Sequence, residues 1–209
     1  METYSFGNES ASIVLLQPVD EHDLHSMESE LAIIKEGITV DFQMIAFRIK
    51  DWNKELSPWK APAVFGNQDF GDGAADTLRN ILRHCADQTK TYYIGGYSLA
   101  GLFSLWAAYQ TDLFQGVAAA SPSVWFPGFT EYMQERAIQS HQVYLSLGDR
   151  EERTRNAVMA TVGDRIRAAN EILRKQGIHC ILEWNEGNHF KEADKRTANA
   201  FLWLLRQTL

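Results

Sequence analysis

The chain has 209 residues, a formal net charge of −7, and is 45% hydrophobic and 22% charged. These proportions are ordinary for a globular protein with one sizeable core, so we expect a single domain over residues 1–209. The acidic balance argues against nucleic acid and anionic membranes as partners, which leaves small molecules or proteins. The first ten residues do not resemble a signal peptide, and no apolar run is as long as a membrane span. We therefore expect a cytoplasmic protein, with its oligomeric state left open.

The first elements in chain order predict a parallel sheet. Residues 12–19 form a continuous apolar run, which is typical of a strand buried on both faces. Apolar residues at helical spacing follow as far as Gly37, and 39–47 supply the next strand. Residues 51–72 show no period and are long for a connection, so we expect a loop over the active face. Trp59 in this loop either lines a substrate pocket or simply anchors the loop.

Residues 92–108 form the stretch around which the other elements are arranged. A short strand at 92–94 leads through two glycines to Ser98, and a helix that is apolar on nearly every side follows at 99–108. A strand, a tight turn and a buried helix are the context in which a G-x-S-x-G serine becomes a nucleophile. Ala100 replaces the second glycine, and a βα turn with a helix-capping serine is the alternative.

The remaining segments continue the alternation of strands and helices. Helices are predicted over 74–85, 158–173 and 193–204, and strands over 114–120, 143–147 and 178–184. With about six strands alternating with helices, the sequence predicts a three-layer α/β sandwich with a mostly parallel sheet.

Three further residues are interpreted from their place in this pattern. Trp125 follows a predicted strand in a loop at the same edge as Ser98, so we expect it to face substrate, with plain packing as the alternative. Cys85 lies on the apolar side of a predicted helix and Cys180 inside a predicted strand. We expect both to be buried thiols. We do not expect them to form a disulfide with each other or to bind a metal together.

A base for the serine is predicted in the last loop of the chain. A serine hydroxyl needs a base to take its proton, and the base needs a carboxylate that fixes its tautomer. His189 lies in the short segment GNHF between the last strand and the last helix. The carboxyl ends of parallel strands share one edge of the sheet, so we expect His189 beside Ser98. His84, His141 and His179 lie on a helix or before a strand and do not share this position.

The acid is predicted where the strand at 143–147 ends in SLGDREER. Asp149, Glu151 and Glu152 all compete for this role, and Glu151 is our first choice by position. The alternatives are structural, because Glu151 could pair with Arg155 one helical turn later and Asp149 could cap a following helix.

Three segments, GGYSLAG, GDREE and GNHF, together resemble the esterase group of the α/β-hydrolase superfamily, similar to esterase D and enterochelin-esterase-type enzymes. The resemblance covers nearly the whole chain from Ser12 and implies the α/β-hydrolase sandwich. In that family the acid commonly comes three residues after the glycine that ends its strand, which points to Glu151 after Gly148. The few residues before Ser12 leave little room for the family's two leading antiparallel strands, so we expect the sheet to lack them.

The oxyanion loop of the family also differs here. The family's His-Gly pair reads Gln17 and Pro18 in this chain. Because Pro18 has no N–H, the donors to an oxyanion are expected to be the backbone amides of Leu99 and Val19.

Several metal-ligand types cluster after the first predicted strand, at Asp20, Glu21, His22, Asp23 and His25. Acidic residues at a helix N-terminus are explained by the helix dipole, and no cysteine or distant histidine completes a recognisable site. We therefore expect no metal and no cofactor.

These observations predict a serine hydrolase that cleaves a carboxylic ester of a small molecule through an acyl-enzyme. Ser98 would attack, His189 would transfer the proton and Glu151 would orient the histidine. An acyltransferase with the same three residues is one alternative. The other is a non-catalytic binding protein on a hydrolase scaffold, because a fold alone does not give activity. The ester itself, whether aryl, alkyl, thioester or siderophore ester, is open.

Overall fold

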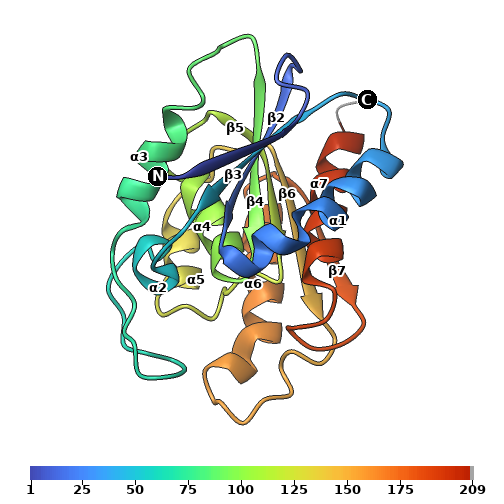
Figure 1. Cartoon of the computed structure of the whole chain (residues 1–209). Coiled ribbons are helices and arrows are strands. Elements are labelled where there is room, and N and C mark those ends of the chain that lie inside the picture. Colours follow the sequence, from blue (N-terminus) through green and yellow to red (C-terminus); the bar gives the residue numbers. More distant parts are fainter. Residues whose placement is uncertain (208–209) are drawn as a thin grey trace.

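The computed structural model describes residues 1–207, which form one seven-stranded sheet in the order β1-β3-β2-β4-β5-β6-β7 (Figure 1). Only the edge strand β1 is antiparallel to its neighbour, and the other strands are parallel. The strands are β1 (Thr3–Gly7), β2 (Ile13–Val19), β3 (Gln43–Arg48), β4 (Thr91–Tyr97), β5 (Phe114–Ala120), β6 (Gln142–Gly148) and β7 (His179–Asn185).

Helices cover both faces of this sheet. On one face α1 (Glu21–Gly37) and α7 (Ala193–Arg206) pack against each other and against the central strands (Figure 1). The helices of the other face are α3 (Ala74–Leu82), α4 (Leu99–Ala107), α5 (Phe129–Glu135) and α6 (Val162–Lys175). Two short helices, α2 (Trp52–Glu55) and the 3-10 turn Met159–Thr161, lie in connections. The predicted three-layer sandwich with a mostly parallel sheet is confirmed.

The two most apolar segments form the centre of this core. All seven residues of β2 and all nine of α4 are buried. Burying a large apolar side chain stabilises the fold by about 1.5–3 kcal/mol, so a segment that is apolar on every side is most stable between two other layers. The helix α4 follows Ser98 directly, and its burial fixes the start of the helix against the carboxyl ends of β4 and β5.

The prediction that the leading strands are missing is wrong for one of them. Residues Thr3–Gly7 form β1, which pairs with β3 from Thr3 opposite Phe47 to Gly7 opposite Gln43. This edge strand alternates between exposed and half-buried residues and has no apolar run, so its pattern did not stand out in the sequence.

Other differences concern short or terminal segments. The helix expected from residue 158 begins at Val162, and Val158 is 41% exposed in the preceding turn. The helix α3 ends at Leu82, before Cys85, although Cys85 is buried as expected. Cys180 is only half-buried, which corrects the expectation of a buried thiol. Burial raises the pKa of Cys85 to about 12, and that of Cys180 is also raised. Within residues 1–207, no helix is both long and apolar enough to cross a membrane.

Candidate active site

Ser98 lies at the turn between β4 and α4 in a strained backbone conformation. Its φ is 56° and its ψ is −119°, a region that residues with a side chain rarely adopt. A Cβ atom on Gly96 would lie 2.7 Å from the Cβ atom of Ala100, so the turn requires glycine there. The Ser98 amide donates to the carbonyl of Ala120 at 3.1 Å, which ties the turn to the end of β5. The hydroxyl is therefore held above the carboxyl edge of the sheet.

His189 approaches this hydroxyl from the loop between β7 and α7. Its Nε2 atom lies 3.0 Å from Ser98 Oγ. The backbone of the same residue is anchored, because the Tyr97 hydroxyl donates to the His189 carbonyl at 2.7 Å. The residue next to the serine thus also fixes the loop that carries the histidine.

Glu151 lies in the turn that follows β6, and its two carboxylate oxygens have different partners. Oε2 is 2.7 Å from His189 Nδ1, whereas Oε1 accepts from the Gly148 amide at 2.7 Å and from the Ser121 hydroxyl at 2.8 Å. Burial opposes ionisation, but the hydrogen bond and charge of His189, with these other donors, hold the pKa of Glu151 below its ordinary value. The carboxylate is thus ionised at neutral pH.

The protonation states follow from this chain of contacts. An ionised carboxylate only accepts hydrogen bonds, so the proton on the ring is assigned to Nδ1, facing Glu151. The other ring nitrogen, Nε2, then carries a lone pair and accepts from the Ser98 hydroxyl. A base aligned in this way takes the serine proton as the oxygen attacks a substrate.

The two competing acids lie elsewhere. Asp149 accepts from the Gly187 amide at 2.8 Å, so its side chain links the turn after β6 to the loop of His189. Glu152 faces Arg167, at 3.8 Å between Oε2 and Nη1, on the surface. Residues 149–152 form a turn and not a helix, and the cation that contacts Glu151 is Arg196 and not Arg155.

Arg196 is a residue of the site that sequence reasoning missed. It lies on α7 and is 3% exposed, and its Nη1 atom is 2.9 Å from Glu151 Oε1. The signal in the sequence was its position, because Arg196 falls three residues after Ala193 and immediately before Thr197, on the stripe that packs on the sheet. A charge on such a stripe is rarely buried without a partner.

The candidate oxyanion donors are partly different from those expected. Leu99 is the first residue of α4, where a backbone N–H has no acceptor within its own helix. The Val19 carbonyl accepts from Ile49, beyond the end of β3, and in a parallel ladder the N–H and C=O of one residue face the same neighbour. The Val19 amide therefore faces β3, away from Ser98 on β4. The Asp20 amide, one residue later, donates to Asp23 Oδ2 at 3.3 Å in the cap of α1, so of the expected pair Leu99 remains the candidate donor.

A cavity of about 240 Å³ opens beside Ser98 and His189. It is lined by Asp20, His22, Asp23, Trp52, Tyr97, Ser98, His189, Phe190 and Ala193. The long loop thus contributes Trp52 to the site. Neither tryptophan expected to bind substrate is among these lining residues. Trp59 donates to the Pro127 carbonyl at 2.9 Å and anchors its loop, and Trp125 is 7% exposed and packs on Phe70.

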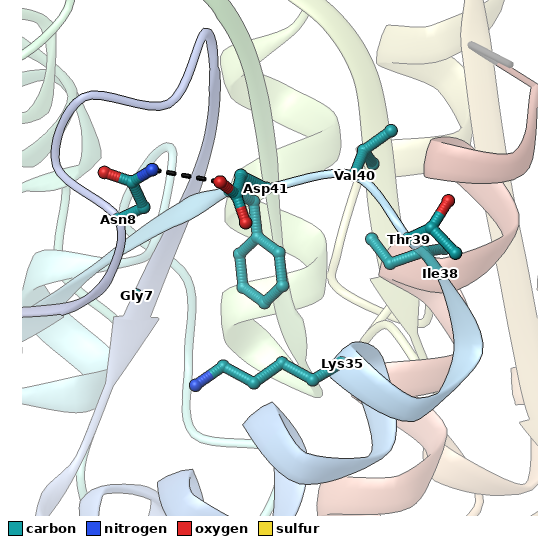
Figure 2. Close-up of a pocket in the computed structure, with 8 residues that line it drawn as sticks. Gly7, Asn8, Lys35, Ile38, Thr39, Val40 and Asp41 are labelled. Carbon is teal, nitrogen blue, oxygen red and sulfur yellow. Dashed lines mark hydrogen bonds between the residues drawn. The ribbon is translucent and has the colours of Figure 1, made fainter.

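A second depression, of about 520 Å³, lies at the opposite edge of the sheet, where Gly7 pairs with the first residue of β3. Figure 2 shows Asn8 bonded to Asp41 there, with the Lys35 side chain of α1 nearby. No serine, cysteine or histidine lines this depression. Within the part of the chain that the structure describes, no group of three or more His, Cys, Asp or Glu side chains is arranged to hold a metal ion.

Comparisons with known proteins agree with the topology. No family model and no curated protein matches the sequence. Among solved structures, an IroE-like serine hydrolase from Shewanella oneidensis has a TM-score of 0.73 and 15% identity, covering 100% of this chain and 81% of that chain. The siderophore hydrolase EstA from Aspergillus nidulans has a TM-score of 0.64 and 19% identity, covering 96% and 84%. The enterobactin esterase FES from Shigella flexneri has a TM-score of 0.67 and 12% identity, covering 99% and 56%.

At these identities the likeness concerns the fold. The strand order, the single antiparallel edge strand and the serine turn after β4 are common features of one architecture. The chain has the α/β-hydrolase fold that these hydrolases and esterases share.

Proposed function

We propose that this protein is a serine esterase that cleaves a carboxylic ester of a small molecule through an acyl-enzyme. The observation that carries the proposal is the unbroken chain of contacts from Glu151 through His189 to Ser98, at 2.7 and 3.0 Å, on a strained turn. Strained backbone at a nucleophile is a recurrent feature of active sites. The α/β-hydrolase fold raises the probability of this chemistry but does not carry it.

The reaction would proceed in two halves. Ser98 Oγ attacks the ester carbonyl while His189 takes the proton, and Glu151 stabilises the imidazolium. The oxyanion accepts a hydrogen bond from the amide of Leu99. His189 then protonates the leaving alcohol, and the acyl group remains on Ser98. In the second half His189 activates a water molecule that hydrolyses the acyl-enzyme and restores the serine.

The test is hydrolysis of a p-nitrophenyl ester by the wild type and two serine variants. Ser98→Ala removes the proposed nucleophile and should lower kcat by several powers of ten, about 10⁴-fold or more. Ser104→Ala is the matched control, because Ser104 is buried in α4 and its hydroxyl donates to the Ala100 carbonyl at 2.8 Å. Ser104→Ala should keep most of the activity. Retention of activity in folded Ser98→Ala would overturn the proposal.

The alternatives differ in what they predict for the same protein. An acyltransferase would form the same acyl-enzyme but would give a new ester when an alcohol is added, so product analysis separates it from a hydrolase. A binding protein on this scaffold would turn over no ester at all. A panel of aryl, alkyl, thio- and siderophore esters then identifies the substrate class, since siderophores appear in the names of similar structures.

A further inference from the structure

The buried guanidinium of Arg196 forms several hydrogen bonds with residues of the candidate site. Its guanidinium is 3% exposed, and a buried charge is costly unless every donor finds an acceptor. Nη1 contacts Glu151 Oε1 at 2.9 Å, the Tyr97 hydroxyl at 3.1 Å and the Ser121 hydroxyl at 3.3 Å. Nη2 donates to the Glu186 carbonyl at 3.1 Å.

These four partners come from four different strand ends. Tyr97 ends β4 just before the serine, Ser121 follows β5, Glu151 follows β6, and Glu186 begins the loop after β7 that carries the histidine. One planar group thus joins every segment that supplies a member of the Ser-His-Glu chain. A guanidinium holds several acceptors in fixed directions, whereas a lysine ammonium is a single flexible point charge.

The contact with Glu151 also divides the carboxylate between two cations. Arg196 lies at Oε1 and His189 at Oε2, so the arginine shares the negative charge that would otherwise face the imidazole alone. A lone carboxylate stabilises the protonated imidazole, and a cation on its other oxygen weakens that effect. Removing the arginine would therefore leave the full charge of the carboxylate to the imidazole.

We propose that Arg196 is a positioning residue of the esterase site, which orients Glu151 and the His189 loop and sets the pH range in which His189 is a base. The proposal rests on the proposed function. Arg196 does not line the cavity beside Ser98, so its effect reaches the substrate only through Glu151 and His189. A purely structural arginine would change stability but neither the pH dependence nor kcat of the folded protein.

Other charged and titratable groups around the histidine remain the same in the test. Asp20, His22 and Asp23 line the same cavity as His189, and the Tyr97 ring lies 5.1 Å from the imidazole. On the arginine side, Glu151 and Tyr97 are the titratable groups whose side chains contact the guanidinium. Any change in the pH profile after replacement of Arg196 alone then reports on the arginine.

The test compares Arg196→Met, Arg196→Lys and Tyr97→Phe by pH–rate profiles of kcat and kcat/KM. Arg196→Met removes the positive charge and the planar guanidinium group. The midpoint of the pH–rate profile should therefore rise by about one pH unit. Its kcat should fall about 10- to 100-fold, with KM within about threefold. Arg196→Lys keeps the charge, so its midpoint should stay at the wild-type value while kcat remains at least about fivefold low. Tyr97→Phe should lower kcat without moving the midpoint.

The control is Arg206→Met, because Arg206 lies at the far end of the same helix, where its guanidinium donates to the Gly37 carbonyl at 3.4 Å. It should leave the profile unchanged. An unchanged or lowered midpoint in Arg196→Met, or wild-type kcat in a folded Arg196→Lys, would overturn the proposal. If Arg196→Met does not fold, the kcat of Arg196→Lys still tests the proposal, because a wild-type value would contradict it. A nuclear magnetic resonance titration of the His189 ring shows the same shift without turnover, so failure of the esterase proposal would leave this one testable.

Discussion

Three residues other than glycine have a positive φ within residues 1–207, and each is a residue of the candidate site or lies in a segment that leads to one. They are Ser98 at 56°, Ser121 at 42° and Glu192 at 52°. Ser121 donates to Glu151, and Glu192 directly precedes the helix that carries Arg196. Such a conformation costs about 1–3 kcal/mol for a residue with a side chain and persists only where its surroundings enforce it. The strain in this fold is thus concentrated in the loops that bring the nucleophile, the acid and the arginine together.

The acid is the residue whose role is most open to test by substitution. Glu151→Gln keeps the size of the side chain but removes the charge that stabilises the imidazolium, so kcat should fall by about two to four powers of ten with little change in KM. Asp149→Asn keeps an oxygen that can accept from the Gly187 amide, and Glu152 lies on the surface beside Arg167. Asp149→Asn and Glu152→Gln should therefore stay within about tenfold of the wild type.

Steady-state kinetics of the three variants on one p-nitrophenyl ester check this expectation, with thermal unfolding as the control for folding. A crippled Asp149→Asn of normal stability would mean that the acid lies nearer the strand end. If none of the three variants loses activity, a Ser-His pair would operate without an acid.

At the residue scale, sequence reasoning located side chains better than backbone groups. Ser98, Glu151 and His189 each follow a strand at the same edge, and the structure brings them within hydrogen-bonding distance. The direction of the Val19 amide depends on strand register, which only the pairing with β3 reveals. Arg196 resembled an ordinary helix charge, because its partners come from four distant segments.

At the scale of elements, α1 is joined to β2 by a buried polar pair. Gln17 Nε2 donates to Glu30 Oε2 at 3.2 Å, and the remaining side-chain oxygens of both residues have no hydrogen-bond partner within residues 1–207. Burial raises the pKa of Glu30 from 4.5 to about 8, and the charges of Asp23 and Asp194 act in the same direction. The pair lies beneath the helix whose first turn lines the cavity.

This pair predicts a pH-dependent stability. Because the raised pKa means that folded Glu30 binds its proton more tightly than the unfolded chain does, its contribution is fully present below pH 4.5 and is lost as pH rises toward 8. Each pH unit in that window removes at most about 1.4 kcal/mol from the free energy of unfolding. Glu30→Gln cannot ionise, so its free energy of unfolding should fall less between pH 5 and 8.

Urea unfolding of both proteins at pH 5, 6.5 and 8 measures the difference in slope. Asp23, whose pKa burial raises to about 6, is present in both proteins, so its own ionisation contributes to both slopes. Parallel slopes for wild type and variant would contradict the account of the Gln17–Glu30 pair.

Elements with long apolar patterns were predicted well, and short elements were not. The strands β2 and β5 and the helices α4 and α7 are near the bounds expected from their patterns, whereas β4, expected over 92–94, continues through both glycines to Tyr97. The edge strand β1 and the seven-residue α5 depend on their neighbours more than on their own sequence. Tertiary packing decides such short segments, because they form few hydrogen bonds alone.

At the scale of the whole molecule, the acidic character of the chain extends to the candidate site. The net charge is −7, and Asp20 and Asp23 line the cavity, whereas no lysine or arginine does so among the described residues. Trp52 adds an aromatic surface to the same cavity, and aromatic faces attract cations. The molecule should therefore favour esters with a positive charge over neutral ones of the same shape.

A matched pair of substrates tests this preference. Acetylcholine and 3,3-dimethylbutyl acetate differ in one positive charge, and kcat/KM should be about fivefold higher for the charged ester at low salt. The ratio should decrease toward one at about 1 M salt, because exposed charges are then screened. Asp23→Asn should reduce the ratio as well. Equal rates for the two esters at low salt would contradict the expectation.

Covalent labelling tests the central claim most directly. A fluorophosphonate reacts with a serine only where a base activates its hydroxyl. The serine oxygen forms a bond to phosphorus, and fluoride leaves. We predict that the intact protein gains the mass of one phosphonyl group and that peptide mapping locates it on Ser98. Ser98→Ala should remain unlabelled, and His189→Ala should react far more slowly. Wild-type protein that stays unlabelled, or that carries the group on another serine such as Ser123, 3.3 Å from the Ser98 hydroxyl, would contradict the account.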